Sequence, residues 1–491
     1  MHARVGVDTD RDAIAFDRMI FGEFLEHFHR QVYGGVFEPG SPLSDNRGFR
    51  KDVIEALREL RVPIVRWPGG CFVSAYHWKD GVGRSRQGVY DKAWRVEEPN
   101  TFGTDEFVAW CRAIGAEPYI CTNAGTGTEE EMSDWVEYCN GSLGKWAKLR
   151  NESGSPRPHN VRYWSIGNEN YGGHEIGAKK APQWAAFVAE SAKMMLRADS
   201  SIRLLAAALP NADWTLPLLQ EAGGYLSYIS IHGYWDGLWS ENKPSDYATC
   251  MMHTRHPEEM IRTAESIINV AGLEGKVAIA FDEWNLRGWH HPNLGGAAFG
   301  DVAARDKNDI NSTYTMADAV FSACFLNTCL RHARSVRIAC MAPVVNARGP
   351  LFVHPGGIVR RTAFHVLKMY SDMLAANVLD CWCGSDAFEH QGQSVPALDA
   401  VATADDSRKK LTFVLVNRHP TARLDCTVKV NGAAVSGAVP AEILSGDSPD
   451  AYNDVDRPDR VVPQSSTLDF RNGATTLGPH SINILQLSRG D

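Results

Sequence analysis

Eight short apolar runs, rich in β-branched and aromatic residues, alternate with longer amphipathic stretches along most of this chain. The runs occupy residues 19–27, 62–69, 116–125, 161–169, 202–210, 225–235, 276–284 and 336–346. Between them, apolar residues recur at helical spacing in residues 47–60, 104–115, 128–140, 182–198, 257–272 and 313–333. Strands that alternate with helices pair in parallel, because each right-handed crossover returns the chain to the same end of the sheet. The pattern therefore predicts an α/β fold.

The number of runs favours a closed (β/α)8 barrel, or TIM barrel, with insertions. An open, doubly wound sheet is the alternative. Such a sheet commonly carries a glycine-rich phosphate-binding turn after its first strand, and the sequence has no such fingerprint. We therefore expect residues 18–374 to form a catalytic barrel.

The pattern changes after about residue 375. Helical periodicity fades, and short alternating runs appear at residues 409–419, 423–430 and 481–488, with turn residues between them. This alternation predicts an all-β sandwich over residues 375–491. Residues 1–17 precede the first barrel strand, and we expect them to add a strand to that sandwich.

Composition excludes several classes of protein. The 50 basic and 59 acidic residues give a net charge of −9, which argues against a nucleic-acid partner. No stretch approaches the roughly 20 apolar residues of a membrane span. The first residues lack an apolar signal segment, and the 11 cysteines are an odd number scattered along the chain. These features predict reduced thiols and a cytoplasmic protein.

Two glutamates carry the strongest chemical signal. Glu169 ends the fourth predicted strand and Glu283 the seventh. The functional residues of such barrels lie at the carboxyl ends of the strands, and strands four and seven face each other across the ring. Glycoside cleavage needs an opposed pair of carboxyl groups, one to protonate the leaving oxygen and one to attack the anomeric carbon. The pair therefore predicts a glycoside hydrolase.

Several side chains at the same ends of the strands can assist this pair. Asn168 is placed to hydrogen-bond a sugar 2-hydroxyl, and the Tyr234 hydroxyl to hold the nucleophile. Arg66 is a donor that can keep the nucleophile ionised, and His232 ends the same strand as Tyr234. We expect the acid to be protonated near neutral pH and the nucleophile to be ionised.

Two other classes of protein remain as alternatives. A metal-dependent barrel hydrolase would need His-x-His after the first strand, where the chain has Glu26-His27. A carbohydrate-binding protein without activity would not need both glutamates. Neither the Cys-Trp-Cys sequence at 381–383 nor His290-His291 has the spacing of a zinc site, so we expect no metal and no cofactor.

Longer motifs reveal a resemblance to a known family. They are FGEFLEHFHRQVYGGVFEPGSPLSDNRGFRKDVIEALRELRVPIVRWPGGCFVSAYHWKDGVG (21–83), DKAWRVEEPNTFGTDEFVAW (91–110), WSIGNEN (164–170), HEIGAK (174–179) and AFDEWN (280–285). Together they resemble glycoside hydrolase family 51 of clan A, the α-L-arabinofuranosidases. The resemblance implies retention of anomeric configuration, a jelly-roll-like sandwich built from both termini, a cytoplasmic location and a homo-oligomer, often a hexamer.

The resemblance also implies roles for single residues. Glu169 corresponds to the general acid/base and Glu283 to the nucleophile. The remaining correspondences are sugar-binding residues Glu26 and Asn168, Arg66 and Tyr234 beside the nucleophile, and Trp94 as an aromatic wall of the cleft.

Three positions depart from the family pattern. Cys71 stands where the family usually has Asn, Pro343 where it usually has Gln, and Asn170-Tyr171-Gly172 where it usually has Met-Asp-Gly. The catalytic pair is intact, so we expect an exo-acting α-L-arabinofuranosidase that releases arabinose from oligosaccharides. The altered pocket leaves open the same mechanism on another sugar: another furanoside, a β-xyloside, or a β-glucan cleaved as by an endo-β-glucanase.

Overall fold

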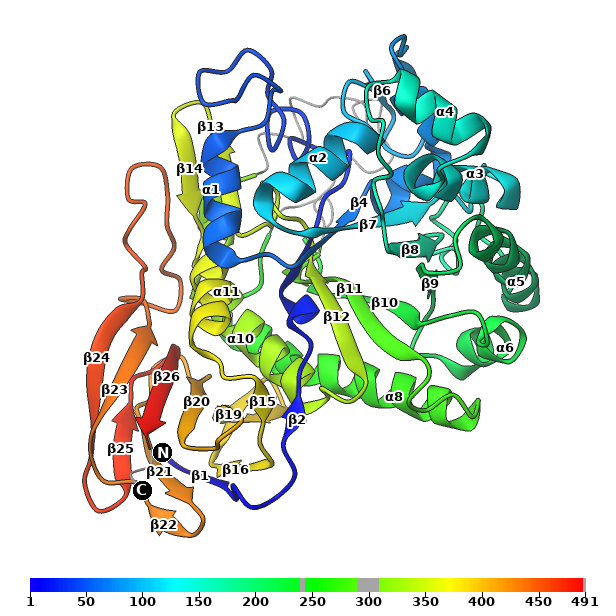
Figure 1. Ribbon diagram of the computed structural model, residues 1–491. Coiled ribbons are helices and arrows are strands. Elements are labelled where there is room, and N and C mark those ends of the chain that lie inside the picture. The colour runs from blue at the N-terminus through cyan, green and yellow to red at the C-terminus, as the bar shows by residue number, and fades with distance from the viewer. Residues whose placement is uncertain (239–242, 289–308, 489–491) are drawn as a thin grey trace.

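A computed structural model describes residues 1–238, 243–288 and 309–488 of the chain. Its centre is a closed barrel of eight parallel strands (Figure 1). Around the ring these are β3 (Gly22–Phe24), β4 (Ile64–Trp67), β7 (Glu117–Thr122), β8 (Tyr163–Ile166), β9 (Arg203–Ala207), β10 (Tyr228–Asp236), β11 (Ala278–Arg287) and β12 (Val336–Met341). Each lies within or overlaps one of the eight predicted runs, so the predicted barrel is confirmed.

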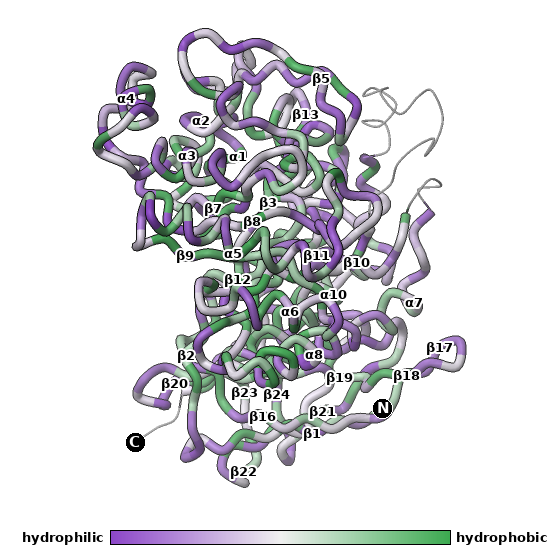
Figure 2. Tube along the Cα trace, turned by 90° about the vertical axis from the view of Figure 1, so that its right-hand side faces the viewer, coloured by the Kyte–Doolittle hydropathy of each residue, from purple (hydrophilic) through white to green (hydrophobic). Residues whose placement is uncertain are grey.

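Helices surround the barrel, and the six predicted helical stretches are all helical. The described helices are α1 (Lys51–Leu60), α2 (Thr104–Ile114), α3 (Glu129–Asn140), α4 (Gly144–Glu152), α5 (Ala181–Ala198), α6 (Ala212–Ala222), α7 (Tyr247–Met252), α8 (His256–Val270), α10 (Met316–Arg331) and α11 (Thr362–Met373). Most present one apolar face to the strands, because their apolar residues recur every three to four positions. Figure 2 shows hydrophobic stretches gathered in the interior around the barrel strands.

The inside of the barrel is filled by side chains. Alternate residues of the strands point inward and form one buried cluster. Its members are Phe24, Ile64, Tyr119, Tyr163, Leu205, Ala280, Ile338, Cys340 and Ala342. Between its described strands the barrel is therefore a packed core with no room for a ligand.

Two antiparallel-rich sheets form the second part of the molecule. One contains β16 (Cys381–Ser385), β1 (His2–Val7), β21 (Leu424–Val430), β22 (Ala433–Ala434) and β25 (Ala474–Leu477). The other contains β2 (Ile14–Ala15), β15 (Asn377–Val378), β19 (Leu398–Ala404), β20 (Lys410–Asn417), β26 (Ser481–Ser488), β23 (Gly437–Leu444) and β24 (Gln464–Phe470). In the first sheet β1 lies between β16 and β21, and it pairs with β21 in parallel. The N-terminal strand is thus an internal strand of a sheet otherwise built from the C-terminal region.

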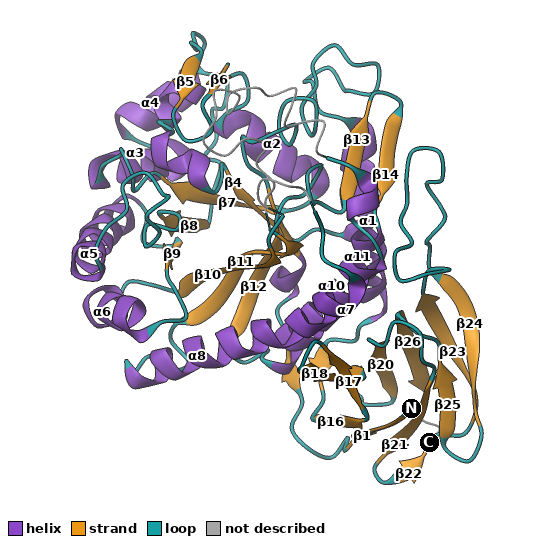
Figure 3. Cartoon of the chain, turned by 180° about the vertical axis from the view of Figure 1, so that it is seen from behind, coloured by secondary structure: helices purple, strands orange, loops and turns teal. Residues whose placement is uncertain are grey.

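Helix α10 joins the two parts. It packs against β11 and β12 of the barrel on one side and against β19 and β20 on the other (Figure 3). Nearly all of its side chains are buried, which is why its sequence is apolar on every face.

Short hairpins complete the fold. They are β5 (Val89–Asp91) with β6 (Val96–Glu98), β13 (Leu351–His354) with β14 (Gly357–Arg360), and β17 (Ala387–His390) with β18 (Gln393–Pro396). Among the described residues, no helix combines the length and the apolar character needed to cross a bilayer.

Candidate active site

The turn that follows β8 presents Glu169 to the mouth of the barrel. Gly167 and Glu169 both have left-handed backbone angles, with φ of 71° and 42°. A Cβ at Gly167 would lie 2.2 Å from the Asn170 side-chain oxygen and 2.5 Å from the Trp184 ring, so only glycine fits. A non-glycine residue at positive φ costs on the order of 1 kcal/mol. The fold accepts this cost at Glu169.

Glu283 reaches the same point from β11. Its partner across the barrel ladder is His232 on β10, and the register shifts between Ser230 and His232. Such a bulge redirects side chains at the rim of a barrel. His232 Nδ1 lies 2.8 Å from Glu169 Oε1 and 3.6 Å from Glu283 Oε1. One carboxyl oxygen of Glu169 lies within 4.8 Å of one of Glu283.

Two donors hold the Glu283 carboxylate. Arg66 Nη1 donates to Oε1 at 2.5 Å, and the Tyr234 hydroxyl donates to Oε2 at 2.7 Å. The Arg66 side chain is fully buried and that of Glu283 is 8% exposed. Charge-assisted hydrogen bonds of this kind stabilise the ionised carboxylate and fix its orientation.

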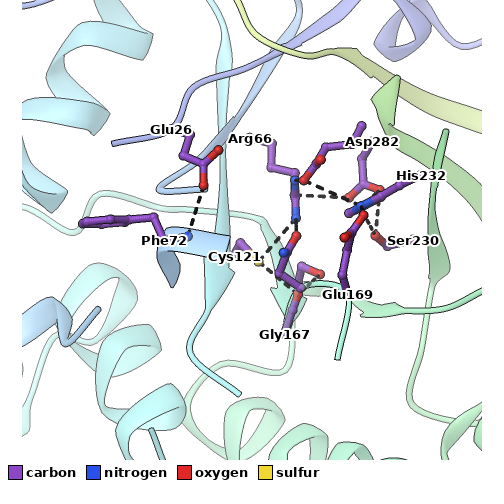
Figure 4. A network of polar contacts seen from close by, with 12 residues as sticks. Glu26, Arg66, Phe72, Cys121, Gly167, Glu169, Ser230, His232 and Asp282 are labelled. Carbon is purple, nitrogen blue, oxygen red and sulfur yellow. Dashed lines mark hydrogen bonds and ion pairs between the residues drawn. The ribbon is translucent and has the colours of Figure 1, made fainter. Parts of the chain in front are cut away.

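Arg66 lies at the centre of a wider network (Figure 4). Its Nη2 donates to Asn168 Oδ1 at 2.7 Å, and its Nε lies 3.5 Å from Asp282. Burial raises the pKa of Asp282, but Arg66, His232 and Tyr119 together bring it below its ordinary value. Arg66 therefore joins the turn that carries Glu169 to the strand that carries Glu283.

The protonation of Glu169 differs from the sequence-based expectation. Burial raises its pKa, but hydrogen bonds with His174 Nε2 at 2.9 Å and with His232 lower it well below the ordinary value. Burial lowers the pKa of His232, yet Glu283, Asp282 and Glu169 raise it to about 10. These contacts favour the ionised form of Glu169 and the protonated form of the His232 imidazole, the reverse of the sequence-based expectation.

Glu26 lies beside the pair in a narrow space. It accepts hydrogen bonds from the Phe72 backbone and from Trp94 Nε1, both at 3.1 Å. Burial and the charge of Glu283 raise its pKa to about 8. A Cβ at Gly70 would come within 2.6 Å of its carboxyl oxygen, so the glycine allows the backbone to approach. At neutral pH the carboxyl group is largely protonated and can both donate to and accept from a hydroxyl.

These groups surround a cavity of about 580 Å³ at the carboxyl ends of the strands. Seven of the residues singled out from the sequence line it: Glu26, Cys71, Trp94, Asn168, Glu169, Tyr234 and Glu283. Arg66 and His232 lie beneath and contact the carboxylates. The segment after β12 contributes Arg348 to the lining, with its guanidinium 4.4 Å above the Tyr234 ring, rather than Pro343.

A larger cavity, of about 1150 Å³, lies at the opposite end of the barrel, where β11 and β12 begin. Its lining mixes Arg262, Lys276, Arg334 and Arg337 with Asp12, Glu265 and Glu274. Glu265 is already engaged by His332 and Ser335. The amino ends of barrel strands generally serve stability, and we place the chemistry at the smaller cavity.

Two residues of the β8–α5 loop, His174 and Glu175, also belong to the site but were not predicted from the sequence as functional. The Glu175 side chain is fully buried; Ser74 donates to it, and Asn168 Nδ2 lies 3.4 Å from its Oε2. Glu175 therefore steadies Asn168 from the side opposite Arg66. The signal for these residues was their place in HEIGAK, a motif noted only as a similarity.

Two groups of side chains among the described residues have the composition and spacing of metal ligands. One is Glu169, His232 and Glu283, in which His232 Nδ1 already lies against both carboxyl groups. The other is Cys71, His174 and Glu175. Burial raises the pKa of the Cys71 thiol, and the nearby negative charge of Glu175 raises it further. His290 and His291 lie outside the described residues.

A closed barrel that presents two adjacent carboxyl groups at the carboxyl ends of opposite strands defines a glycoside hydrolase. Residues 56–251 match the α-L-arabinofuranosidase 1 domain, and residues 282–481 match the α-L-arabinofuranosidase C-terminal domain. The chain belongs to the α-L-arabinofuranosidases of glycoside hydrolase family 51, as the relatives below also show.

An intracellular exo-α-(1→5)-L-arabinofuranosidase of Halalkalibacterium halodurans is 36% identical over 440 residues, which cover 86% of each chain. The crystal structure of an α-L-arabinofuranosidase from Thermotoga maritima in complex with arabinose has a TM-score of 0.88 and 32% identity, covering 99% of this chain and 100% of that one. A family 51 arabinofuranosidase from Xanthomonas axonopodis pv. citri has a TM-score of 0.89 and 26% identity, with coverage of 99% and 100%.

Proposed function

We propose that this chain is a retaining, exo-acting α-L-arabinofuranosidase that removes arabinose from the non-reducing ends of oligosaccharides. The separation of the two carboxyl groups carries the proposal. Retaining enzymes hold them about 5–5.5 Å apart, whereas inverting enzymes leave about 6.5–9.5 Å for a water molecule. The approach within 4.8 Å of oxygens of Glu169 and Glu283 supports retention.

In the first step Glu283 attacks the anomeric carbon while Glu169 gives a proton to the departing glycosidic oxygen. A glycosyl–enzyme ester forms and the aglycone leaves as an alcohol. In the second step Glu169 takes a proton from water, which attacks the same carbon and releases both arabinose and the Glu283 carboxylate. Glu169 needs a proton at the start, and the hydrogen bond of 2.8 Å from His232 is a direct route for it.

The sugar would occupy the inner part of the cavity. Asn168 and Glu26 offer hydrogen bonds to hydroxyl groups, and Trp94 and Cys71 form part of the wall. The names of the relatives favour α-L-arabinofuranose. A second candidate rests on the departures from the family at Cys71 and Pro343. It is the same mechanism on another sugar: another furanoside, a β-xyloside, or a β-glucan cleaved as by an endo-β-glucanase.

We also propose a cytoplasmic location and a homo-oligomer, a hexamer by family resemblance. The state of the cysteines supports the first point, because all 11 are free and eight are buried. The relative from Halalkalibacterium halodurans is named an intracellular enzyme. Fractionation of the source cells and light scattering of the purified protein test the two statements.

The decisive experiment compares Glu169→Gln, Glu283→Gln and an exposed control, Glu190→Gln. Judged by kcat/KM, Glu169→Gln should abolish cleavage of arabino-oligosaccharides but spare the first step on aryl arabinofuranosides, whose leaving groups need no proton, while the second step, which needs the base, becomes slow. Glu283→Gln should prevent formation of the covalent intermediate, which intact-protein mass spectrometry detects. Equal losses on both substrates in Glu169→Gln would contradict its role as an acid.

Two further measurements address the stereochemistry and the sugar. Proton NMR of the first product shows which anomer is released, and an inverted product would refute the double displacement. A panel of nitrophenyl glycosides separates the arabinofuranosidase proposal from the alternatives, since only the correct sugar should be cleaved at a high rate.

A further inference from the structure

Cys71, His174 and Glu175 form a compact cluster at one side of the cavity. One potential ligand atom of each lies within 4.8 Å of the other two. His174 Nε2 is 4.0 Å from Glu175 Oε2, and the Cys71 thiol lies within 4.8 Å of a Glu175 carboxyl oxygen. The proposed hydrolysis uses none of these three groups to transfer a proton or attack the substrate.

The three side chains of the cluster differ in how firmly their surroundings hold them. Cys71 begins the 3-10 helix Cys71–Ala75 directly after β4, and Glu175 is fully buried and held by Ser74. His174 has a side chain that is 58% exposed. Two ligand positions are therefore fixed by the fold, while the third can rotate to meet an ion.

The three groups match the preferences of one kind of ion. A thiolate, an imidazole and a carboxylate are the ligands of zinc, which accepts four of them in tetrahedral geometry. Bond lengths of about 2.0–2.3 Å place the ligand atoms of such a site about 3.3–3.7 Å apart. The ligand atoms of the present cluster lie within 4.8 Å of one another, so movements of at most about 1.5 Å would bring them to that spacing.

We propose that Cys71, His174 and Glu175 form a binding site for Zn²⁺ or a similar divalent ion, with the fourth position open to the cavity. Binding exchanges the thiol proton, released to solvent, for the metal. It also takes His174 Nε2 away from Glu169 Oε2, with which it makes a hydrogen bond of 2.9 Å.

The site would act as an inhibitory switch. The ion covers Cys71, which lines the cavity, and places positive charge next to the acid/base. Both effects oppose binding of the sugar and transfer of its proton, so occupancy and turnover should exclude each other. This effect on turnover rests on the proposed function, whereas binding of the ion does not.

Light absorption by bound Co²⁺ reports occupancy of the site independently of enzyme turnover. Addition of Co²⁺ to the whole protein should give one equivalent of binding with a thiolate-to-metal charge-transfer band, and Zn²⁺ should displace it. Cys71→Ser should abolish the band, and Cys71→Ser, His174→Ala and Glu175→Gln should each weaken Zn²⁺ binding by roughly 100-fold or more in calorimetry, because losing a ligand costs more than losing an outer-shell partner.

Cys383→Ser is the matched control, since Cys383 is an exposed thiol on the sandwich strand β16. It should retain the band and the affinity of the wild type. In parallel, Zn²⁺ should inhibit the wild type and Cys383→Ser reversibly, with EDTA restoring activity. Circular dichroism confirms that each variant is folded, and His174→Ala replaces Cys71→Ser if the latter is not. Absence of the band in the wild type, or unchanged affinity in the folded ligand variants, overturns the proposal.

Discussion

Glu23 lies in the second position of β3, on the face opposite Phe24, which points into the barrel. Its side chain is fully buried, and neither carboxyl oxygen has a hydrogen-bond partner among the described residues. Burial raises its pKa well above the ordinary value of 4.5. We predict that Glu23→Gln stabilises the protein, and that the gain grows with pH.

The sign and the size of the stability difference between Glu23→Gln and wild type follow from proton linkage. The unfolded chain loses the Glu23 proton above its ordinary pKa of 4.5, whereas the folded protein keeps it. Unfolding thus releases a proton, and wild-type stability falls by about 1.4 kcal/mol per pH unit above that value. At pH 7 the accumulated loss of unfolding free energy is roughly 3 kcal/mol if the carboxyl group remains neutral in the folded protein. Glutamine is equally polar and of the same shape but cannot ionise, so it removes only this loss.

Urea unfolding monitored by tryptophan fluorescence, repeated between about pH 5 and pH 8, measures the effect. The difference in unfolding free energy between Glu23→Gln and wild type should rise by about 1.4 kcal/mol per pH unit. Glu190→Gln, which alters an exposed glutamate on α5, should show no such slope. A difference that is the same at every pH would mean that Glu23 is ionised in the folded protein and would refute the reasoning.

Three predictions concern the residues around the carboxylate pair. Tyr234→Phe removes the donor 2.7 Å from Glu283, and we expect kcat on an aryl arabinofuranoside to fall about 10-fold with a smaller change in KM; an unchanged kcat would show that the bond is dispensable. His174→Ala removes one donor that lowers the pKa of Glu169. The pair of Glu169 and His232 should then hold its proton to higher pH, which moves the basic limb of the kcat/KM profile to higher pH, while an unmoved limb would contradict the assignment. Arg66→Met leaves Glu283 and Asp282 without their buried cation, and thermal unfolding should reveal a loss of roughly 3–5 kcal/mol; a smaller loss would mean that the two carboxylates find other partners.

The barrel and the facing pair of Glu169 and Glu283 were predictable from the sequence for a physical reason. Strands that are buried on both faces leave continuous apolar runs, and a polar residue directly after such a run must lie at the rim. Glu169 follows this rule, whereas Glu283 lies inside β11, which continues beyond the predicted run to Arg287. The parallel order of the strands then places them on opposite sides of the mouth, whatever the length of the loops between them.

Loop residues and proton positions were not accessible in the same way. His174 and Glu175 lie in the β8–α5 loop, and no periodicity fixes where a loop directs its side chains. The lowered pKa of Glu169 depends on its contacts with His174 and His232, which exist only in three dimensions. Glu23 also belongs to the first barrel strand, but the alternation along β3 turns it away from the cavity.

The pairing of β1 with β21 imposes an order on biosynthesis. His2 lies opposite Asp425 and Val7 opposite Val430, so the first strand must wait for more than 400 residues to be translated. At roughly 5–20 residues per second this delay is on the order of 20–80 s. During that time the barrel segment can emerge and fold, while the waiting strand exposes two unpaired edges to the ribosome and to chaperones. A tag fused at this end would remain attached to a strand that cannot enter its sheet until both β16 and β21 have been made.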